Sequence, residues 1–350
     1  MTEYRGKLIK NIYYMLSYAF QVLRQENYEE IVGEEFDEVE DLFAAILVKG
    51  VSRQLKQGLY REYIPLSDNL NVIRGKLDMN RQIQNIMMKN SKVSCIFDEL
   101  SIDNFYNQIL KTAMYYLVKA RGVQNERKSD LKKLLVFFCD VRLLEPAEIH
   151  WNQLYFQRNN QNYEMLLNIC YFILSGMLQT TDDGSYRMAS FTDEHMAKLY
   201  EKFILEYYLR HYPELEARSS QIAWNLDADT PMIKFLPSMQ TDITLRNKKN
   251  GKTLIIDAKF YSHTMQVQFD KPTLHSNNMY QIFAYVKNED KNASGNVSGI
   301  LLYGKTEEQI TPDCMYSISG NRIGAKTLDL NQDFKEIARQ LNCLADEYVS

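Results

Sequence analysis

Hydrophobic residues recur every three to four positions in several long segments of the chain, which is the spacing of amphipathic helices. In the segment 11–25, for example, Ile12, Leu16 and Phe20 fall on one helical face. The same period predicts further helices over residues 41–50, 103–120, 128–140, 162–178, 195–212, 278–287 and 333–348. For the helix over 41–50, an acidic residue at the start and Gly50 at the end predict its limits.

Other segments carry the shorter apolar runs that are typical of strands. Residues 59–79 predict a small β element whose turn lies at Ser67-Asp68-Asn69. Strands are also predicted over residues 219–224, 235–245, 253–261 and 297–304. The second half of the chain therefore reads α, β, β, β, α, β, followed by additional elements.

A polar segment separates the two halves. Residues Gln179 to Glu194, "QTTDDGSYRMASFTDE", are rich in turn-forming residues and show no sustained period. We therefore predict two domains, 1–185 and 186–350, each long enough to bury its own core. The first is expected to be an α+β domain of helices with the small β element, and the second an α/β domain around a central mixed sheet.

Composition narrows the classes of function. The five cysteines have no CxxC spacing, so we expect free thiols in a reducing cytoplasm. No apolar stretch approaches the roughly 20 residues that span a membrane. The net charge is −4, whereas proteins that grip nucleic acid unaided are usually basic. An enzyme that acts on nucleic acid with this charge would therefore need a local basic groove or a partner protein that provides most of the binding affinity.

The tripeptide Gly251-Lys252-Thr253 resembles the end of a phosphate-binding loop. Such a loop also needs a glycine five residues before Gly251, where this chain has Arg246. Asn250 and Gly251 are instead typical of a hairpin turn, because both tolerate positive φ. The pattern predicts a turn between two strands and no nucleotide site.

Three charged residues on this hairpin are candidates for chemistry. Asp257 and Lys259 are two positions apart on one strand, so their side chains point to the same face, and the returning strand can bring Asp242 beside them. Two carboxylates bind Mg²⁺ or Mn²⁺ through oxygen, and a lysine stabilises developing negative charge. A solvated strand face is the alternative explanation of the same pattern.

The helices on either side of the hairpin add further candidates. Glu206 on the preceding helix is expected to add a carboxylate, with Glu201 as the competing choice; either residue is also compatible with a solvated helix position. On the following helix, Gln281 and Tyr285 are four residues apart and share one face. A polar helix edge with a packed tyrosine explains this last pair equally well.

The arrangement resembles the PD-(D/E)XK nuclease core, with "DAK" at Asp257–Lys259 as the second half of its motif. Pro237 does not immediately precede Asp242, so the motif is not matched literally. Over nearly its full length the chain is similar to the McrC family, the nuclease subunits of McrBC modification-dependent restriction systems. The segments that carry this resemblance are "NIYYMLSYAF", "IRGKLD", "FDELSIDNFYNQILK", "LPSMQTDITL", "LIIDAKFY" and "HSNNMYQIFAYV".

The resemblance implies a Mg²⁺-dependent endonuclease that cuts double-stranded methylated DNA with a hexameric AAA+ GTPase, McrB, whose GTP hydrolysis it stimulates. Asp242, Asp257 and Ala258 would then hold the metal, with Lys259, Gln281 and Glu206 also catalytic. The N-terminal domain would engage the GTPase, and Arg74 in the β element is our candidate contact. Two alternatives remain open: a non-catalytic activator of the GTPase, and a stand-alone RecB-like nuclease.

Overall fold

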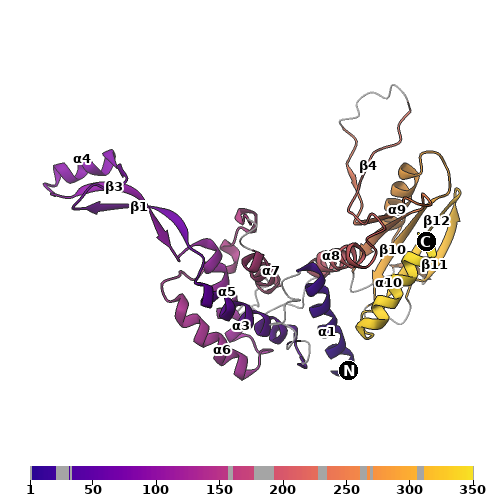
Figure 1. The fold of residues 1–350 in the computed structure, drawn as a ribbon, viewed down its shortest axis with the longest axis horizontal. Helices are drawn as coiled ribbons and strands as arrows, with labels where there is room; N and C mark the ends of the chain where they lie inside the picture. The colour runs from indigo at the N-terminus through magenta and orange to yellow at the C-terminus, as the bar shows by residue number, and fades with distance from the viewer. Residues whose placement is uncertain are drawn as a thin grey trace. The chain divides into compact units, whose positions relative to one another are not determined.

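The computed structural model describes residues 2–20, 31, 34–156, 161–176, 193–227, 235–260, 266–268, 271–305 and 311–349. The chain divides into two compact units (Figure 1). The first unit comprises Glu40–Ala189, and the second unit joins Met1–Val39 to Ser190–Ser350. Most of the predicted linker, Gln179 to Glu194, lies outside the described residues. None of the described helices combines the length and the apolar character that crossing a membrane requires.

The first helix, α1 (Thr2–Ala19), belongs to the second unit and not to the first, in contrast to the predicted division at residue 185. α1 belongs to the second unit because it packs on α8 (Asp193–His211). The Tyr18 ring lies 5.4 Å from the Phe203 ring, and the Tyr18 hydroxyl lies 2.7 Å from His211 Nε2. Asn11 adds two hydrogen bonds from Nδ2 to the backbone after β12, one of them to Leu330 O at 2.7 Å. These contacts tie the N-terminus to residues 190–350.

The body of the first unit is helical. It consists of α3 (Val39–Gln57), α5 (Phe105–Lys119), α6 (Asn125–Leu135) and α7 (Gln161–Gly176), with short 3-10 turns at Val136–Phe138, Pro146–Glu148 and Trp151–Gln153. The predicted end of α3 at Gly50 is wrong, because Gly50 is buried by packing and the helix continues seven residues further. Buried Asp41 pairs with Arg127 at 2.5 Å and joins α3 to α6.

A three-stranded sheet projects from this body (Figure 1). Its strands β1 (Glu62–Leu70), β2 (Lys76–Leu77) and β3 (Val93–Ser101) lie in the order β1-β3-β2, and α4 (Met79–Met87) packs on β3. We call residues Glu62–Ser101 the finger. The predicted turn at Ser67-Asp68-Asn69 is wrong, because β1 pairs with β3 without a break through these residues. After Leu70 the chain instead crosses to the other edge of β3, where β2 begins directly after Gly75, whose φ is +67°.

The second unit is built on a five-stranded sheet in the order β11-β12-β10-β7-β6. The strands are β6 (Ile243–Arg246), β7 (Thr253–Lys259), β10 (Val297–Gly304), β11 (Cys314–Ile318) and β12 (Asn321–Leu328). β10 runs parallel to β7 and β12, whereas β6 and β11 are antiparallel to their neighbours, so the sheet is mixed as predicted. Two-stranded ribbons are formed by β4 (Gln221–Ile222) with β5 (Met239–Gln240), and by β8 (Gln266–Gln268) with β9 (Lys271–Thr273).

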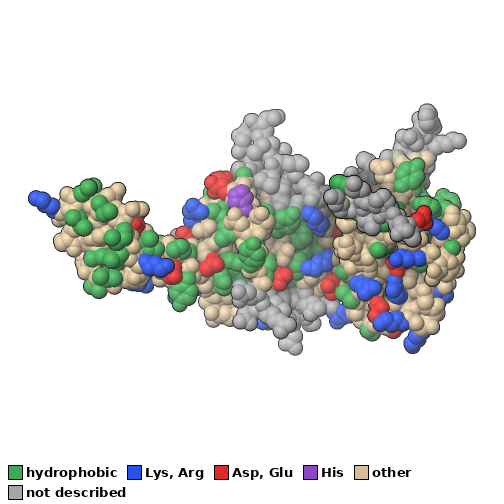
Figure 2. Space-filling view, turned by 90° about the horizontal axis from the view of Figure 1, so that it is seen from above, with side chains coloured by type: hydrophobic (Ala, Val, Ile, Leu, Met, Phe, Trp, Pro, Cys, Tyr) green, Lys and Arg blue, Asp and Glu red, His purple; other side chains and the backbone are tan. Residues whose placement is uncertain are grey.

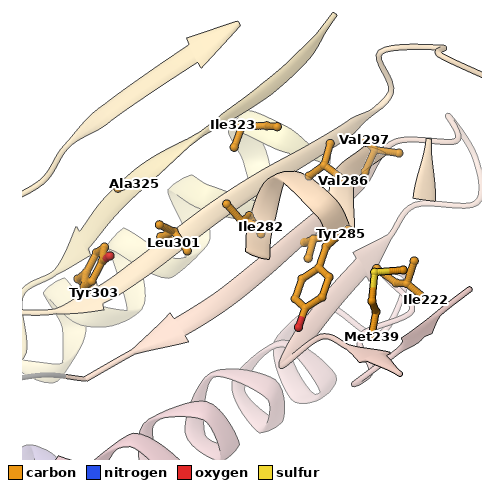
Figure 3. Packing of buried hydrophobic residues seen from close by; sticks show 11 residues of the cluster. Ile222, Met239, Ile282, Tyr285, Val286, Val297, Leu301, Tyr303, Ile323 and Ala325 are labelled. Carbon is orange, nitrogen blue, oxygen red and sulfur yellow. The ribbon is translucent and has the colours of Figure 1, made fainter. Parts of the chain in front are cut away.

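Helix α9 (Ser276–Glu289) covers one face of this sheet, and α8 packs with α10 (Phe334–Tyr348) on the other. Figure 3 shows the buried cluster under α9, where Ile282 and Val286 lie over β10. Gly299 makes this approach possible, because a Cβ there would lie 2.5 Å from Val286 Cγ2 and 2.8 Å from Ile282 Cγ1. The close contact fixes the position of the α9 face that carries Gln281.

Candidate active site

The hairpin of β6 and β7 brings the predicted charged residues together. Asp257 and Lys259 project from the same face of β7, and Lys259 Nζ lies 2.7 Å from Asp257 Oδ2. Asp242 immediately precedes β6, and its Oδ2 accepts a hydrogen bond from the backbone N–H of Ala258 at 2.8 Å. Asp242 therefore sits beside Asp257, as expected for a hairpin.

Asp257 is a buried carboxylate with little compensation. The residue is 1% exposed. Within the described part of the chain, neither of its oxygens accepts a hydrogen bond of normal geometry, although Oδ2 forms the ion pair with Lys259. Buried polar atoms without partners are uncommon in folded proteins and call for an explanation. A buried carboxylate that has only the Lys259 ion pair to compensate it, next to a second carboxylate, is suited to binding a cation.

Burial and mutual repulsion weaken the acidity of these groups. Burial, together with the negative charges of Asp257 and Glu201, raises the pKa of Asp242 to about 7, against the opposing effects of the Ala258 N–H and Lys259. Burial also raises the pKa of Asp257, while Lys259 opposes it. The two carboxylates interact strongly, so they share one protonation equilibrium rather than titrating independently.

The structure places Glu201, and not Glu206, next to this pair. Burial raises the pKa of Glu201, an effect that Lys259 opposes and Asp257 increases. On the same helix Glu206 lies five residues further, which turns it by roughly 140° around the axis. The geometry therefore brings Glu201, the competing choice, to the site. This corrects our expectation that Glu206 adds the carboxylate.

Gln281 reaches the site through Tyr285. Its Nε2 donates a hydrogen bond to the Tyr285 hydroxyl at 2.8 Å, so the two share a helix face as predicted. Burial raises the pKa of Tyr285, Gln281 opposes the rise, and the charges of Asp257 and Asp242 add to it. The ring projects from α9 at the end of the apolar cluster (Figure 3). We did not predict this contribution of Tyr285 beyond its spacing from Gln281.

The residues present fit a divalent cation bound by oxygen. Among the described residues, no three acidic, cysteine or histidine side chains form a ready-made metal cage. The fit rests instead on the two carboxylates and on the incomplete hydrogen bonding of Asp257 among the described residues, since Mg²⁺ takes few protein ligands and keeps several waters. Ala258 offers only backbone atoms, and its N–H is already used by Asp242.

The remaining candidate, Arg74, lies in the finger of the other unit. Its guanidinium carbon stands 4.3 Å from the centroid of the Phe97 ring. The residue is exposed, and Gly75 follows it with a positive φ where a Cβ would lie 2.3 Å from Ile96 O. A guanidinium stacked on a ring keeps its N–H edges available for a carboxylate or phosphate.

Comparisons with known proteins identify relatives of this chain. A family model described as McrBC 5-methylcytosine restriction system component matches residues 4–304. The Escherichia coli (strain K12) protein named Type IV methyl-directed restriction enzyme EcoKMcrBC is 28% identical over 347 residues, which cover 97% of this chain and 98% of the relative.

Two solved structures show a weaker likeness. One is a refined half-complex from a tetradecameric assembly of Thermococcus gammatolerans McrB AAA+ hexamers with bound McrC, at 19% identity and a TM-score of 0.47, covering 88% of this chain and 68% of that chain. The other is the cryo-EM structure of the Thermococcus gammatolerans McrBC complex, at 19% identity and a TM-score of 0.42, covering 59% of each chain.

The raised pKa of Asp242 gives a pH-dependent prediction. A carboxyl whose folded pKa of about 7 exceeds its ordinary value of 3.8 stabilises the fold fully at low pH, and this contribution is lost as the pH rises through about 7. Asp242→Asn keeps an acceptor for the Ala258 N–H but carries no charge. Above about pH 8, without added metal, we expect its free energy of unfolding to exceed that of the wild type by about 1–3 kcal/mol.

Urea unfolding at several pH values measures this difference, which should close toward pH 4. The matched control is Asp313→Asn. This side chain is 70% exposed and belongs to the residue directly before β11, which forms the opposite edge of the sheet from β6. A difference between Asp242→Asn and the wild type that does not change with pH would contradict the assignment.

Proposed function

The chain belongs to the McrBC family of 5-methylcytosine restriction system components, and we propose that it is the subunit that cuts DNA, a Mg²⁺-dependent endonuclease with a PD-(D/E)XK core. Its substrate is methylated double-stranded DNA, and it works in the cytoplasm with a McrB-like AAA+ GTPase whose hydrolysis it stimulates. Family membership supports the system, and the charged cluster on the hairpin supports the chemistry.

A single observation carries the nuclease proposal. Asp257 is almost fully buried, accepts no hydrogen bond of normal geometry from the described residues, and is adjacent to a second buried carboxylate and to Lys259, with which it forms an ion pair. Each buried carboxylate costs stability, and an apolar pair would pack in the same place at lower cost. A non-catalytic activator of a GTPase has no need of this arrangement.

The protein groups have distinct roles in the proposed reaction. Asp242 and Asp257 hold the cation, and Glu201 lies close enough to add to the negative field. A bound Mg²⁺ supplies Lewis acidity and lowers the pKa of attached water. Lys259 is placed to stabilise the charge that develops on the phosphate, and Tyr285 with Gln281 borders the carboxylates.

The finger supports the proposed contact with the GTPase. Its surface carries many exposed hydrophobic side chains (Figure 2). They are Tyr63, Leu66, Val72, Ile73, Leu77, Met79, Ile83, Ile86, Met87, Met88, Ile96 and Leu100. Exposed apolar patches of this kind mark interaction sites, and methionine adapts well to a partner surface. We assign partner binding to the unit Glu40–Ala189 and its contact to the finger, with Arg74 beside the apolar surface.

Metal dependence is the first prediction of this function. The isolated chain should bind Mn²⁺ in isothermal titration calorimetry, and the complex with its GTPase should cut methylated DNA only with Mg²⁺ or Mn²⁺ present, because the carboxylate pair needs a cation to act on phosphate. The binding measurement uses the chain alone, since the GTPase has its own metal requirement. Full cleavage in the presence of excess EDTA would contradict the proposal.

Substitution of Asp257 should separate the two activities. Asp257→Asn removes one cation-binding charge in the second unit while the finger is unchanged, so we expect cleavage to fall at least about 100-fold with GTPase stimulation retained. Both activities are measured on one preparation, with Asp313→Asn as the exposed Asp-to-Asn control and circular dichroism to check folding. A folded Asp257→Asn protein that still cuts would favour the non-catalytic activator or a different site.

Substitution in the finger should have the opposite effect. Ile86 is 66% exposed on α4, so Ile86→Glu leaves the core intact but places a charge on the apolar surface. GTPase stimulation should fall at least about tenfold, because a buried unpaired charge at an interface costs a few kcal/mol. Arg74→Ala is expected to act in the same direction. The control is Phe137→Glu, an equally accessible apolar site (59% exposed) on the helical body; equal losses in both variants would remove the finger from the contact.

A further inference from the structure

The strand that carries Asp242 is interrupted immediately before β6. Gln221 lies opposite Gln240, and Arg218 lies opposite Thr244. Between these two pairs, two residues of one strand face three residues, 241–243, of the other. This is a β-bulge, a feature that bends a strand and can redirect a side chain next to an active site.

The bulge changes where the backbone of Thr241 points. The register of β6 with β7 pairs Ile243 with Ile256, and its continuation would place Thr241 opposite Ala258. Instead, the Thr241 N–H donates to Ser220 O at 2.9 Å, on the side away from β7. Ala258 thereby loses its regular backbone acceptor. Its N–H binds the Asp242 carboxylate at 2.8 Å in place of a carbonyl.

The Thr241 side chain holds this bulge. The residue is 1% exposed. Its hydroxyl accepts the Ser220 N–H at 3.0 Å and lies 3.2 Å from Ser220 O and 2.9 Å from Thr244 Oγ1. Its carbonyl accepts a hydrogen bond from the Ser219 hydroxyl at 2.6 Å. The side chain and the backbone of Thr241 are therefore both hydrogen-bonded to the segment Ser219–Ser220. This leaves the Asp242 side chain on the side of β7.

We propose that Thr241 is a positioning residue: its buried hydroxyl locks the bulge that aims the Asp242 carboxylate at Asp257, and so sets how tightly the pair binds a divalent cation. This rests on the proposed function, because it concerns the same cation site. Thr241 does not contact the reacting atoms, and it acts through the backbone of the residue next to it. Groups that orient a metal ligand in this way commonly change metal affinity about 10- to 100-fold when removed.

The test uses the full-length chain and Mn²⁺ as the probe. Thr241→Val keeps the branched shape and removes the hydroxyl, whereas Thr241→Ser keeps the hydroxyl. Calorimetry should show about 10- to 100-fold weaker Mn²⁺ binding by the valine variant and an affinity within about twofold of the wild type for the serine variant. In the complex with the GTPase, saturating Mn²⁺ should restore most of the cleavage rate of the valine variant, since the ligands themselves remain.

Two further variants keep the test decisive. Ser219→Ala removes the hydrogen bond to the Thr241 carbonyl at an exposed position, so it should fold and weaken Mn²⁺ binding in the same direction even if Thr241→Val does not fold. Thr112→Val removes another fully buried hydroxyl, in the first unit, and should leave Mn²⁺ affinity unchanged. It therefore controls for a general loss of stability.

The outcomes separate this proposal from the function on which it rests. If the wild type binds Mn²⁺ far more tightly than Asp257→Asn does, but folded Thr241→Val and Ser219→Ala match the wild type, the positioning role is overturned and the nuclease proposal stands. If Asp257→Asn and the wild type bind Mn²⁺ equally, the cation site itself is absent and both proposals fail.

Discussion

The second unit is organised around the burial of a carboxylate pair. Taking Asp257 and Asp242 out of water while holding them together opposes folding twice, through desolvation and through repulsion. The structure offsets this with one ion pair from Lys259 and one backbone hydrogen bond from Ala258. The offset is incomplete, since no described residue gives the oxygens of Asp257 a hydrogen bond of normal geometry. Such a site can persist only where the surrounding sheet and helices leave its side chains no alternative arrangement.

Rigidity comes from the elements on both sides of β7. Its parallel partner β10 is buried along its whole length, and α9 lies close to it at Gly299. On the other face, the hydroxyl of Tyr208 on α8 donates to Leu341 O on α10 at 2.8 Å. Charged groups are thus held by packed neighbours instead of by flexible loops, which is what precise positioning of reacting groups requires.

The parts of the fold that could be predicted are those with a local cause. Strand β10 was predicted at its observed limits from the short run "VSGILLYG", all of which is buried in the structure, and the charged hairpin followed from the alternation of side chains. Glu206 was preferred wrongly although a signal existed: Lys202, Glu206 and Arg210 recur at four-residue steps, which is typical of a solvated helix face. Family resemblance, and not periodicity, supplied the biological system.

Features that depend on distant pairing left no such signal. Ser67, Asp68 and Asn69 have turn composition, yet they lie in a strand because Asn69 bonds through its side chain to Asn85 and Ser94 from the neighbouring elements. The bulge at Thr241 depends in the same way on a segment some twenty positions earlier. The helix end predicted at Gly50 was wrong for the same reason, because tertiary packing accommodates this glycine inside α3.

The placement of α1 makes the second unit discontinuous, with Glu40–Ala189 inserted between its two parts. During synthesis the inserted unit leaves the ribosome complete while α1 still awaits α8 and α10. Asp242 and Asp257 follow later in the chain, so the candidate active site forms after the inserted unit has been synthesised. The same topology means that a fragment beginning at residue 186 lacks the helix against which Phe203 packs, and severing the two units requires two cuts in the chain.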